Sequence, residues 1–224
     1  MPTASNRIER PAKPSDKAEG LRERKKLATR THISDMATKL FMARGFEQVT
    51  IDDVAVAANV SKMTVFNYFP RKEDLFFDRS DDTQQLLRTA LDRRGGRSPM
   101  AALRALAHDL VEQGHPVTKV SRDIAVYWKV VAESPSLHAR ALELLEQLER
   151  ELSHMLSASV EAQANDPTAR LIAAMVLGAW RVAFGEALRC QRSAPVATVR
   201  QVFLELLDRG FAAAGTAARG TPYA

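Results

Sequence analysis

The stretch TIDDVAVAANVSKMTVFNYFP, which spans residues 50–70, contains the strongest local signals in the chain. Thr50 is a favoured helix N-cap, and Asp53 follows it at the three-residue spacing of a capping box. Asn59 tolerates a left-handed backbone conformation and therefore suits a tight turn. Ser61 is the next favoured N-cap, and the residue before a proline is pushed out of the helical region. The stretch thus predicts two short helices joined by a turn, the second ending just before its proline.

The second of these helices has two different faces. Val65 and Phe69 stand four residues apart, so they share a face that we expect to pack inward. The side chains that fall largely on another face offer a cation, an amide and two apolar tips: Lys62, Met63, Phe66 and Asn67. Lysine can donate to guanine, asparagine can pair with adenine, and apolar tips can contact the thymine methyl. This arrangement predicts a helix-turn-helix between Thr50 and Phe69, with the second helix in the major groove of DNA.

The segment from about Lys26 to Phe77 resembles the N-terminal domain of the TetR family of transcriptional regulators. The family pattern T-x-x-x-[IV]-A-x-x-A-x-V-S-x-x-T-[LVF]-[YF]-x-[YH]-F-x-x-K-E-x-L is met at each of its specified positions. These positions are Thr50, Val54, Ala55, Ala58, Val60, Ser61, Thr64, Val65, Phe66, Tyr68, Phe69, Lys72, Glu73 and Leu75. So many matched positions make this signal far more specific than a helix-turn-helix spacing alone.

The resemblance implies a role for each polar position of the motif. Thr50 would cap its helix and let the N-terminal amides meet a phosphate. Thr64 and Tyr68 would reach phosphates through their hydroxyls, and Lys72 would bind another phosphate. The exposed residues of the second helix would face base edges. Two alternatives stay open. Phe66 is either a core residue or a DNA contact, and Tyr68 is either a phosphate contact or a partly buried aromatic side chain.

The composition favours an all-α fold. The 224 residues are 46% hydrophobic but only 6% aromatic, and abundant alanine and leucine favour helices over sheet. No apolar run reaches the roughly 18 residues of a membrane span, and the first residues lack the apolar core of a secretory signal. A single cysteine excludes an internal disulfide and fits a reducing compartment. We therefore expect a cytoplasmic protein without membrane contact.

The positive charge of the chain is concentrated at its N-terminus. Residues 1–30 hold nine Lys or Arg against four Asp or Glu, which accounts for the whole net charge of +5. A basic arm beside a DNA-binding module would add phosphate contacts. The alternative, which the charge run by itself favours, is a solvated tail.

Breaks in the apolar periodicity predict about nine helices and no strand. A fourth helix is expected from about Arg71 to Arg94, closed by Gly95 and Gly96. The predicted organisation is a disordered basic arm (1–20), a helix-turn-helix domain (21–94), a ligand-binding and dimerisation domain (95–214) and a flexible tail (215–224). In this prediction the fourth helix joins the N-terminal three-helix domain to a C-terminal helical bundle.

In the TetR family the C-terminal part binds a ligand and forms the dimer, so the resemblance implies both roles here. Candidate lining residues of a ligand pocket are Leu106, Leu110, Tyr127, Trp128, Val131, Leu148 and Met155. Candidate dimer residues on the last two helices are Leu177, Trp180, Phe184, Val199, Phe203 and Leu206. The alternative for both sets is the plain core of one subunit, since apolar stripes at helical spacing are the usual sign of a core.

The residues and the resemblance together predict a sequence-specific transcriptional regulator. We expect a homodimeric repressor that leaves a palindromic operator when an apolar or amphipathic small molecule binds. Histidines and the cysteine show no metal-like spacing, so neither a metal nor another cofactor is expected. The alternatives are a helical-bundle enzyme, which no catalytic motif supports, and a helical adaptor that lacks DNA binding.

Overall fold

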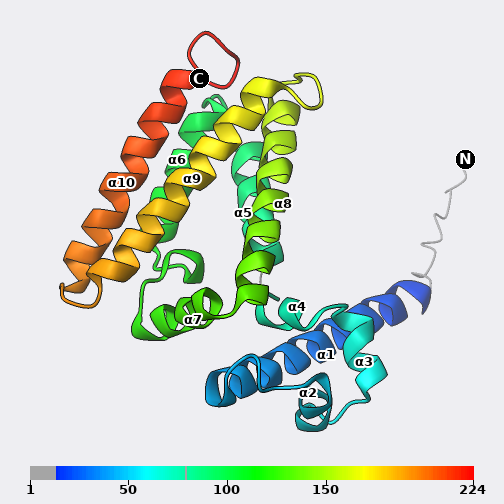
Figure 1. The fold of residues 1–224 in the computed structure, drawn as a ribbon. Coiled ribbons are helices and arrows are strands. Elements are labelled where there is room, and N and C mark those ends of the chain that lie inside the picture. Colours follow the sequence, from blue (N-terminus) through cyan, green and yellow to red (C-terminus); the bar gives the residue numbers. More distant parts are fainter. Residues whose placement is uncertain (1–13, 79) are drawn as a thin grey trace, which may run out of the picture. The chain divides into compact units, whose positions relative to one another are not determined.

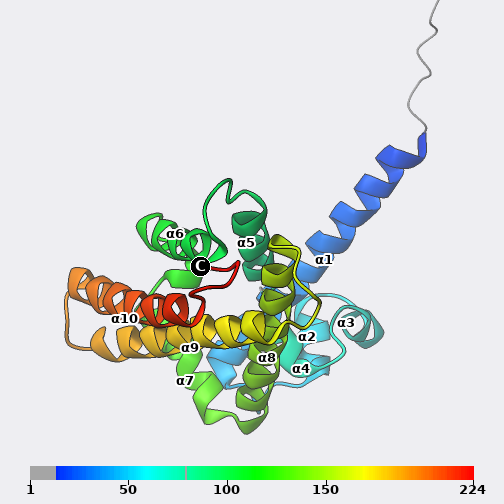
Figure 2. The same cartoon turned by 90° about the horizontal axis from the view of Figure 1, so that it is seen from above.

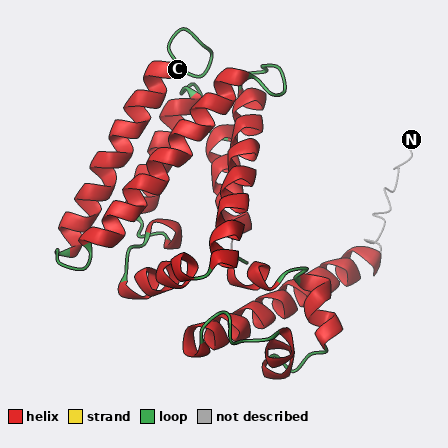
Figure 3. Cartoon of the chain, viewed as in Figure 1, coloured by secondary structure: helices red, strands yellow, loops and turns green. Residues whose placement is uncertain are grey.

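The computed structural model describes residues 14–78 and 80–224. In these residues all regular structure is helical, with ten α-helices, one 3₁₀ helix and no strand (Figures 1 and 3). The predicted all-α class is therefore confirmed. The chain divides into two compact units, Met1–Phe76 and Phe77–Ala224.

The first unit holds the helix-turn-helix. Its helices are α1 (Pro14–Arg44), α2 (Ile51–Ala57), α3 (Lys62–Tyr68) and α4 (Lys72–Phe76). α1 packs against α2 and α4, and α2 packs against α3. α1 ends where Gly45 adopts a φ of 85°, a left-handed helix end that glycine accepts without steric cost.

Aromatic rings form the centre of this unit's core. The ring centroid of Phe41 lies 4.9 Å from that of Phe46 and 5.9 Å from that of Phe76. Val65 on α3 and Phe69, the C-cap residue of this helix, are fully buried, as their spacing predicted. Burying such side chains stabilises by about 1.5–3 kcal/mol each, so apolar packing holds α3 against the rest of the unit.

The second unit is a helical bundle. It comprises α5 (Ser80–Asp92), α6 (Pro99–Glu112), the 3₁₀ helix η1 (Pro116–Thr118), α7 (Arg122–Glu133), α8 (Pro135–Ser159), α9 (Pro167–Cys190) and α10 (Val196–Ala217). α9 lies between α8 and α10 in both views (Figures 1 and 2). Side chains cap the starts of α6, α7, α8 and α9, from Ser98, Ser121, Ser134 and Asp166 respectively.

α9 has the length and composition of a membrane-spanning helix. Its most apolar window has a mean hydropathy of 1.6, and 33% of that window is buried within the unit. A core helix meets the same criteria. Because α9 packs against both α8 and α10, we assign it to the core of the bundle.

The prediction of one helix from Arg71 to Arg94 is wrong. α4 ends at Phe76 and α5 begins at Ser80. The break has a physical reason, because two adjacent rings pack within two different units. Phe76 packs on Phe46 at a centroid distance of 6.1 Å, whereas Phe77 meets the ring of Tyr127 edge-on at 6.4 Å. The boundary between the units accordingly falls after Phe76, not after residue 94.

The predicted flexible tail 215–224 is also wrong. α10 continues to Ala217, and the side chain of Tyr223 is fully buried. The Tyr223 hydroxyl donates to Asp166 Oδ2 at 2.5 Å, and its carbonyl accepts from the backbone of Met100. A buried aromatic ring thus overrides the small, polar character of the segment. Of the predicted disordered arm, residues 1–13 lie outside the described residues, while 14–20 form the first turns of α1.

Candidate nucleic-acid interface

The start of α2 is fixed by a capping box. Thr50 Oγ1 accepts from the backbone of Asp53, and Asp53 Oδ2 accepts from the backbone nitrogen of Thr50 at 2.8 Å. Asp53 Oδ1 also receives Nη1 of Arg44 at 3.3 Å. The hydrogen bonds from Thr50 and the nearby guanidinium lower the pKa of Asp53 to about 2. The Asp53 carboxylate therefore stabilises the N-terminus of α2, and its charge is partly balanced by Arg44.

The turn between α2 and α3 follows the sequence signals. Asn59 adopts a φ of 52°, the left-handed conformation that asparagine tolerates. Ser61 Oγ accepts from the backbone nitrogen of Thr64 at 3.0 Å, and their two hydroxyls are 2.8 Å apart. The Thr64 hydroxyl is thus already engaged within α3, and only its remaining hydrogen-bonding capacity can reach a phosphate.

The residues predicted to face base edges do lie on an exposed face of α3. Met63 is 69% exposed and Phe66 is 41% exposed, and Lys62 and Asn67 are exposed as well. The exposure of Phe66 removes the alternative that its ring belongs to the core. Tyr68 is half-buried, which fits both a phosphate contact and the alternative of a partly buried aromatic side chain.

Lys62 does not stand alone on this face. Its Nζ lies 2.8 Å from Asp52 Oδ2, in a salt bridge whose two side chains are largely exposed. Spacing along the sequence did not predict this bridge across the turn. The bridge places the Lys62 ammonium beside a carboxylate of α2.

Two further cations rest on aromatic rings of the first unit. Lys72 Nζ lies 4.2 Å from the ring centroid of Phe46 and 5.9 Å from that of Phe41. Partial burial lowers the pKa of Lys72 from its usual range. The guanidinium carbon of Arg30, on α1, lies 4.8 Å above the ring of Phe69. From the sequence, Arg30 was counted only in the charge excess of residues 1–30.

The predicted ligand-pocket residues do not line a common cleft among the described residues. Among them only Leu106 lines the cleft of about 480 Å³ that the second unit contains between α5 and α6. Leu110, Val131 and Met155 are buried, with Met155 in the main core cluster, while Leu148 and Tyr127 are half-buried. Trp128 is 38% exposed and contacts Phe184 at a centroid distance of 6.0 Å.

The predicted dimer residues divide into two groups. Val199 and Phe203 are buried in the subunit's own core at 4% and 2% exposure, so the alternative reading holds for these two. Phe203 packs edge-on against Trp180 at 5.4 Å, which explains its burial. The others, Leu177, Trp180, Phe184 and Leu206, are half-buried at the edge of the same cluster.

The sequence matches two family models, which together cover most of the chain. The model described as bacterial regulatory proteins, tetR family, matches residues 33–78, and the model of the MftR C-terminal domain matches residues 97–212. The chain belongs to the TetR family. The family consists of transcriptional regulators, which sets aside the enzyme alternative.

Named relatives of this TetR-family chain are regulators too. It is 27% identical to the HTH-type regulator TcmR of Streptomyces glaucescens over 62% of this chain and 63% of that protein. It is 30% identical to the regulator MftR of Mycobacterium tuberculosis over 54% of this chain and 60% of that protein. The chain thus matches less than two thirds of the length of either relative. The TetR-family repressor FadR of Thermus thermophilus, solved with lauroyl-CoA, shares the fold with a TM-score of 0.52 at 24% identity, covering 81% of this chain and 92% of FadR.

Among the residues that the structure describes, no group of three or more His, Cys, Asp or Glu could hold a metal ion.

In this TetR-family chain the features that the sequence did not predict are contacts between helices, such as the Asp52–Lys62 bridge and the Arg30–Phe69 stack. Residue spacing along one helix cannot reveal them. The ten-residue separation of an acid and a base across a predicted tight turn is the one available hint for the bridge.

Proposed function

We propose that this protein is a sequence-specific DNA-binding repressor that acts as a cytoplasmic homodimer and leaves a palindromic operator when a small molecule binds. The observation that carries the proposal is the geometry of α3. One face is anchored by the buried Val65 and Phe69, and the other presents Met63 and Phe66 to solvent. A short helix held in this way can enter the major groove without losing its packing.

Individual roles follow from chemistry and exposure. Lys62, Met63, Phe66 and Asn67 would read base edges. Thr50, Thr64, Tyr68 and Lys72 would contact phosphates. A contact with a phosphate adds affinity for every sequence, whereas a contact with a base edge changes which sequence is preferred.

Pairing of two subunits would use the outward face of α9. Leu171 and Val182 are 52% and 49% exposed, and eleven residues make three helical turns, so they lie on one face. A two-fold dimer through this face would match a palindromic site. Leu171→Glu combined with Val182→Glu should convert the protein to monomers in analytical ultracentrifugation, and a dimer that persists would refute this face.

DNA selection from a random pool tests the proposal as a whole. Wild-type protein should enrich a palindromic site and retard it in a gel. Alanine at Lys62, Thr64, Tyr68 and Lys72 together should abolish retardation. A matched control carries Lys129→Ala and Thr216→Ala, which remove an exposed cation and hydroxyl from the second unit. Undiminished DNA binding by the quadruple variant would refute the interface.

A further inference from the structure

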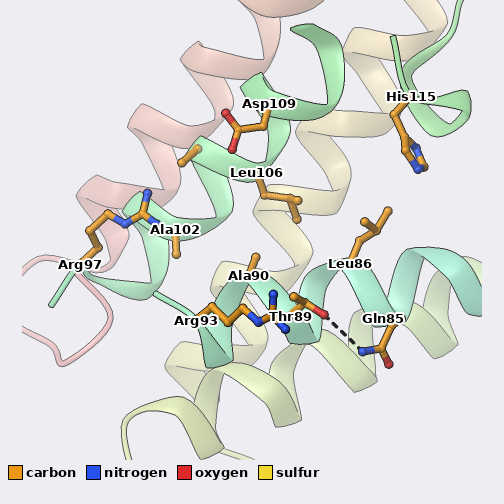
Figure 4. A pocket seen from close by; sticks show the side chains of 11 residues that line it. Gln85, Leu86, Thr89, Ala90, Arg93, Arg97, Ala102, Leu106, Asp109 and His115 are labelled. Atoms are coloured by element: carbon orange, nitrogen blue, oxygen red, sulfur yellow. Dashed lines mark hydrogen bonds between the residues drawn. The ribbon is translucent and has the colours of Figure 1, made fainter. Parts of the chain in front are cut away.

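A cleft of about 480 Å³ lies between α5 and α6 in the second unit. Its volume falls within the range of small-molecule pockets. Figure 4 shows Leu86 of α5 and Leu106 of α6 pointing into its middle. Three alanines complete the apolar lining: Ala90, Ala102 and Ala105. The middle of the cleft therefore offers an apolar surface to a ligand.

One end of the cleft is cationic. Arg93 follows the end of α5 and Arg97 precedes the start of α6, and Figure 4 shows both at the same end. No salt bridge joins either guanidinium to a carboxylate of the described residues. Asp109 also lines the cleft, but it stands three helical turns beyond Arg97 along the chain and forms no such bridge.

The connection that carries these arginines is held in place. Arg94 Nη2 donates to the carbonyl of Ser159 at 2.5 Å, and its Nη1 donates to the carbonyl of Arg97 at 2.8 Å. Arg97 Nε in turn donates to the carbonyl of Arg94 at 3.3 Å. Gly95 allows the tight turn with its φ of 62°. Arg97 is thus positioned by neighbouring groups that leave its terminal nitrogens available.

We propose that this cleft binds an amphipathic anion, with a carboxylate or phosphate head between Arg93 and Arg97 and an apolar body against Leu86 and Leu106. Guanidinium groups bind the oxygens of carboxylates and phosphates in bidentate geometry. Gln85 and His115 at the opposite end of the cleft (Figure 4) leave room there for a polar terminus. The inference rests on the proposed function, because it names the chemical class of the effector.

Binding of matched ten-carbon probes to the full chain tests the class. Calorimetry would compare decanoate, decyl phosphate and decan-1-ol, each below its micelle or solubility limit. At least one of the two anions should bind about tenfold or more tightly than the alcohol, because only the anions form charge-assisted hydrogen bonds. The ratio between decanoate and decyl phosphate identifies which head group the arginines prefer.

Three variants locate the site. Arg93→Gln and Arg97→Gln should each weaken the preferred anion by about three- to tenfold and leave the alcohol unchanged. Ala105→Phe, which fills the cleft, should weaken anion and alcohol alike. Arg88→Gln is the matched control, since it removes an exposed arginine of α5 that does not line the cleft. Circular dichroism would verify that each variant folds.

Equal affinity for anion and alcohol, or anion binding that neither arginine variant changes, would overturn the inference. Gel retardation of the selected DNA site is a separate readout. Protein that binds decanoate but no DNA refutes the proposed function and leaves the cleft assignment standing. Protein that binds DNA but distinguishes neither decanoate nor decyl phosphate from decan-1-ol refutes the cleft assignment alone.

Discussion

The crossing of α9 and α10 yields a sharp prediction at Gly210. A Cβ added there would lie 2.1 Å from the Cβ of Ala179 on α9, whereas carbon atoms in contact prefer about 3.5–4.0 Å. Both atoms belong to helices that pack along their length, so neither can yield as a flexible side chain would. Gly210→Ala must therefore separate the two helices or distort one of them.

The magnitude follows from two opposing effects. Overpacking a closely packed site costs about 1–3 kcal/mol, while replacing glycine by alanine inside a helix gains about 1 kcal/mol. Gly185→Ala provides the matched control, because a Cβ there meets nothing within 4 Å. The helix-propensity gain is common to both variants, so their free energies of unfolding should differ by about 1–3 kcal/mol, with Gly210→Ala the less stable.

Urea unfolding monitored by circular dichroism at one fixed protein concentration measures this difference. The double variant Ala179→Gly with Gly210→Ala moves the methyl group from one helix to the other. It should regain most of the stability that Gly210→Ala loses, since the two sites share one contact. If Gly210→Ala is as stable as Gly185→Ala, or if the double variant is the least stable of the set, the steric reasoning is refuted.

Three further predictions concern polar contacts. Asp52→Asn should free Lys62 and remove a negative charge from the interface, raising DNA affinity by up to about fivefold; fluorescence anisotropy that shows weaker binding would contradict this role. Tyr223→Ala should lower the free energy of unfolding by about 3–5 kcal/mol through loss of a buried ring, whereas Tyr223→Phe keeps the ring and should cost less; equal losses in urea titrations would contradict the packing argument. The pKa of Asp53 is lowered from 3.8 to about 2, so its contribution to stability is present above pH 3.8 and is lost as the pH falls toward 2. Acid titration of Asp53→Asn should lack this part of the loss, and an unchanged acid profile would show that the carboxylate is not coupled to folding.

The sequence predicted the helix-turn-helix well because its signals are local. The N-caps at Thr50 and Ser61, the left-handed Asn59 and the stop before Pro70 all depend on neighbours within four residues. The exposed face of α3 also followed from spacing alone. In the helix-turn-helix, local propensity and tertiary packing favour the same structure, so the structure can be predicted from the sequence.

Prediction failed where distant packing overrides local character. The buried Tyr223 depends on Asp166, 57 residues away, and no periodicity in the tail reveals this contact. The break between α4 and α5 depends on which core each of two adjacent phenylalanines enters. Likewise, helical spacing of apolar residues does not distinguish a cleft lining from a core. Leu106 lines a cleft and Met155 belongs to the core, although both lie on apolar stripes.

The position of Lys72 over the aromatic cluster has a consequence for the entropy of binding. A free lysine side chain carries about 2 kcal/mol of rotamer entropy, and ordering it on a phosphate lowers affinity by part of that amount. The ring of Phe46 already restricts the Lys72 ammonium, so less freedom remains to be lost in the proposed phosphate contact. Phe46 is buried and touches no phosphate in this scheme, yet it makes the interface more preorganised for DNA.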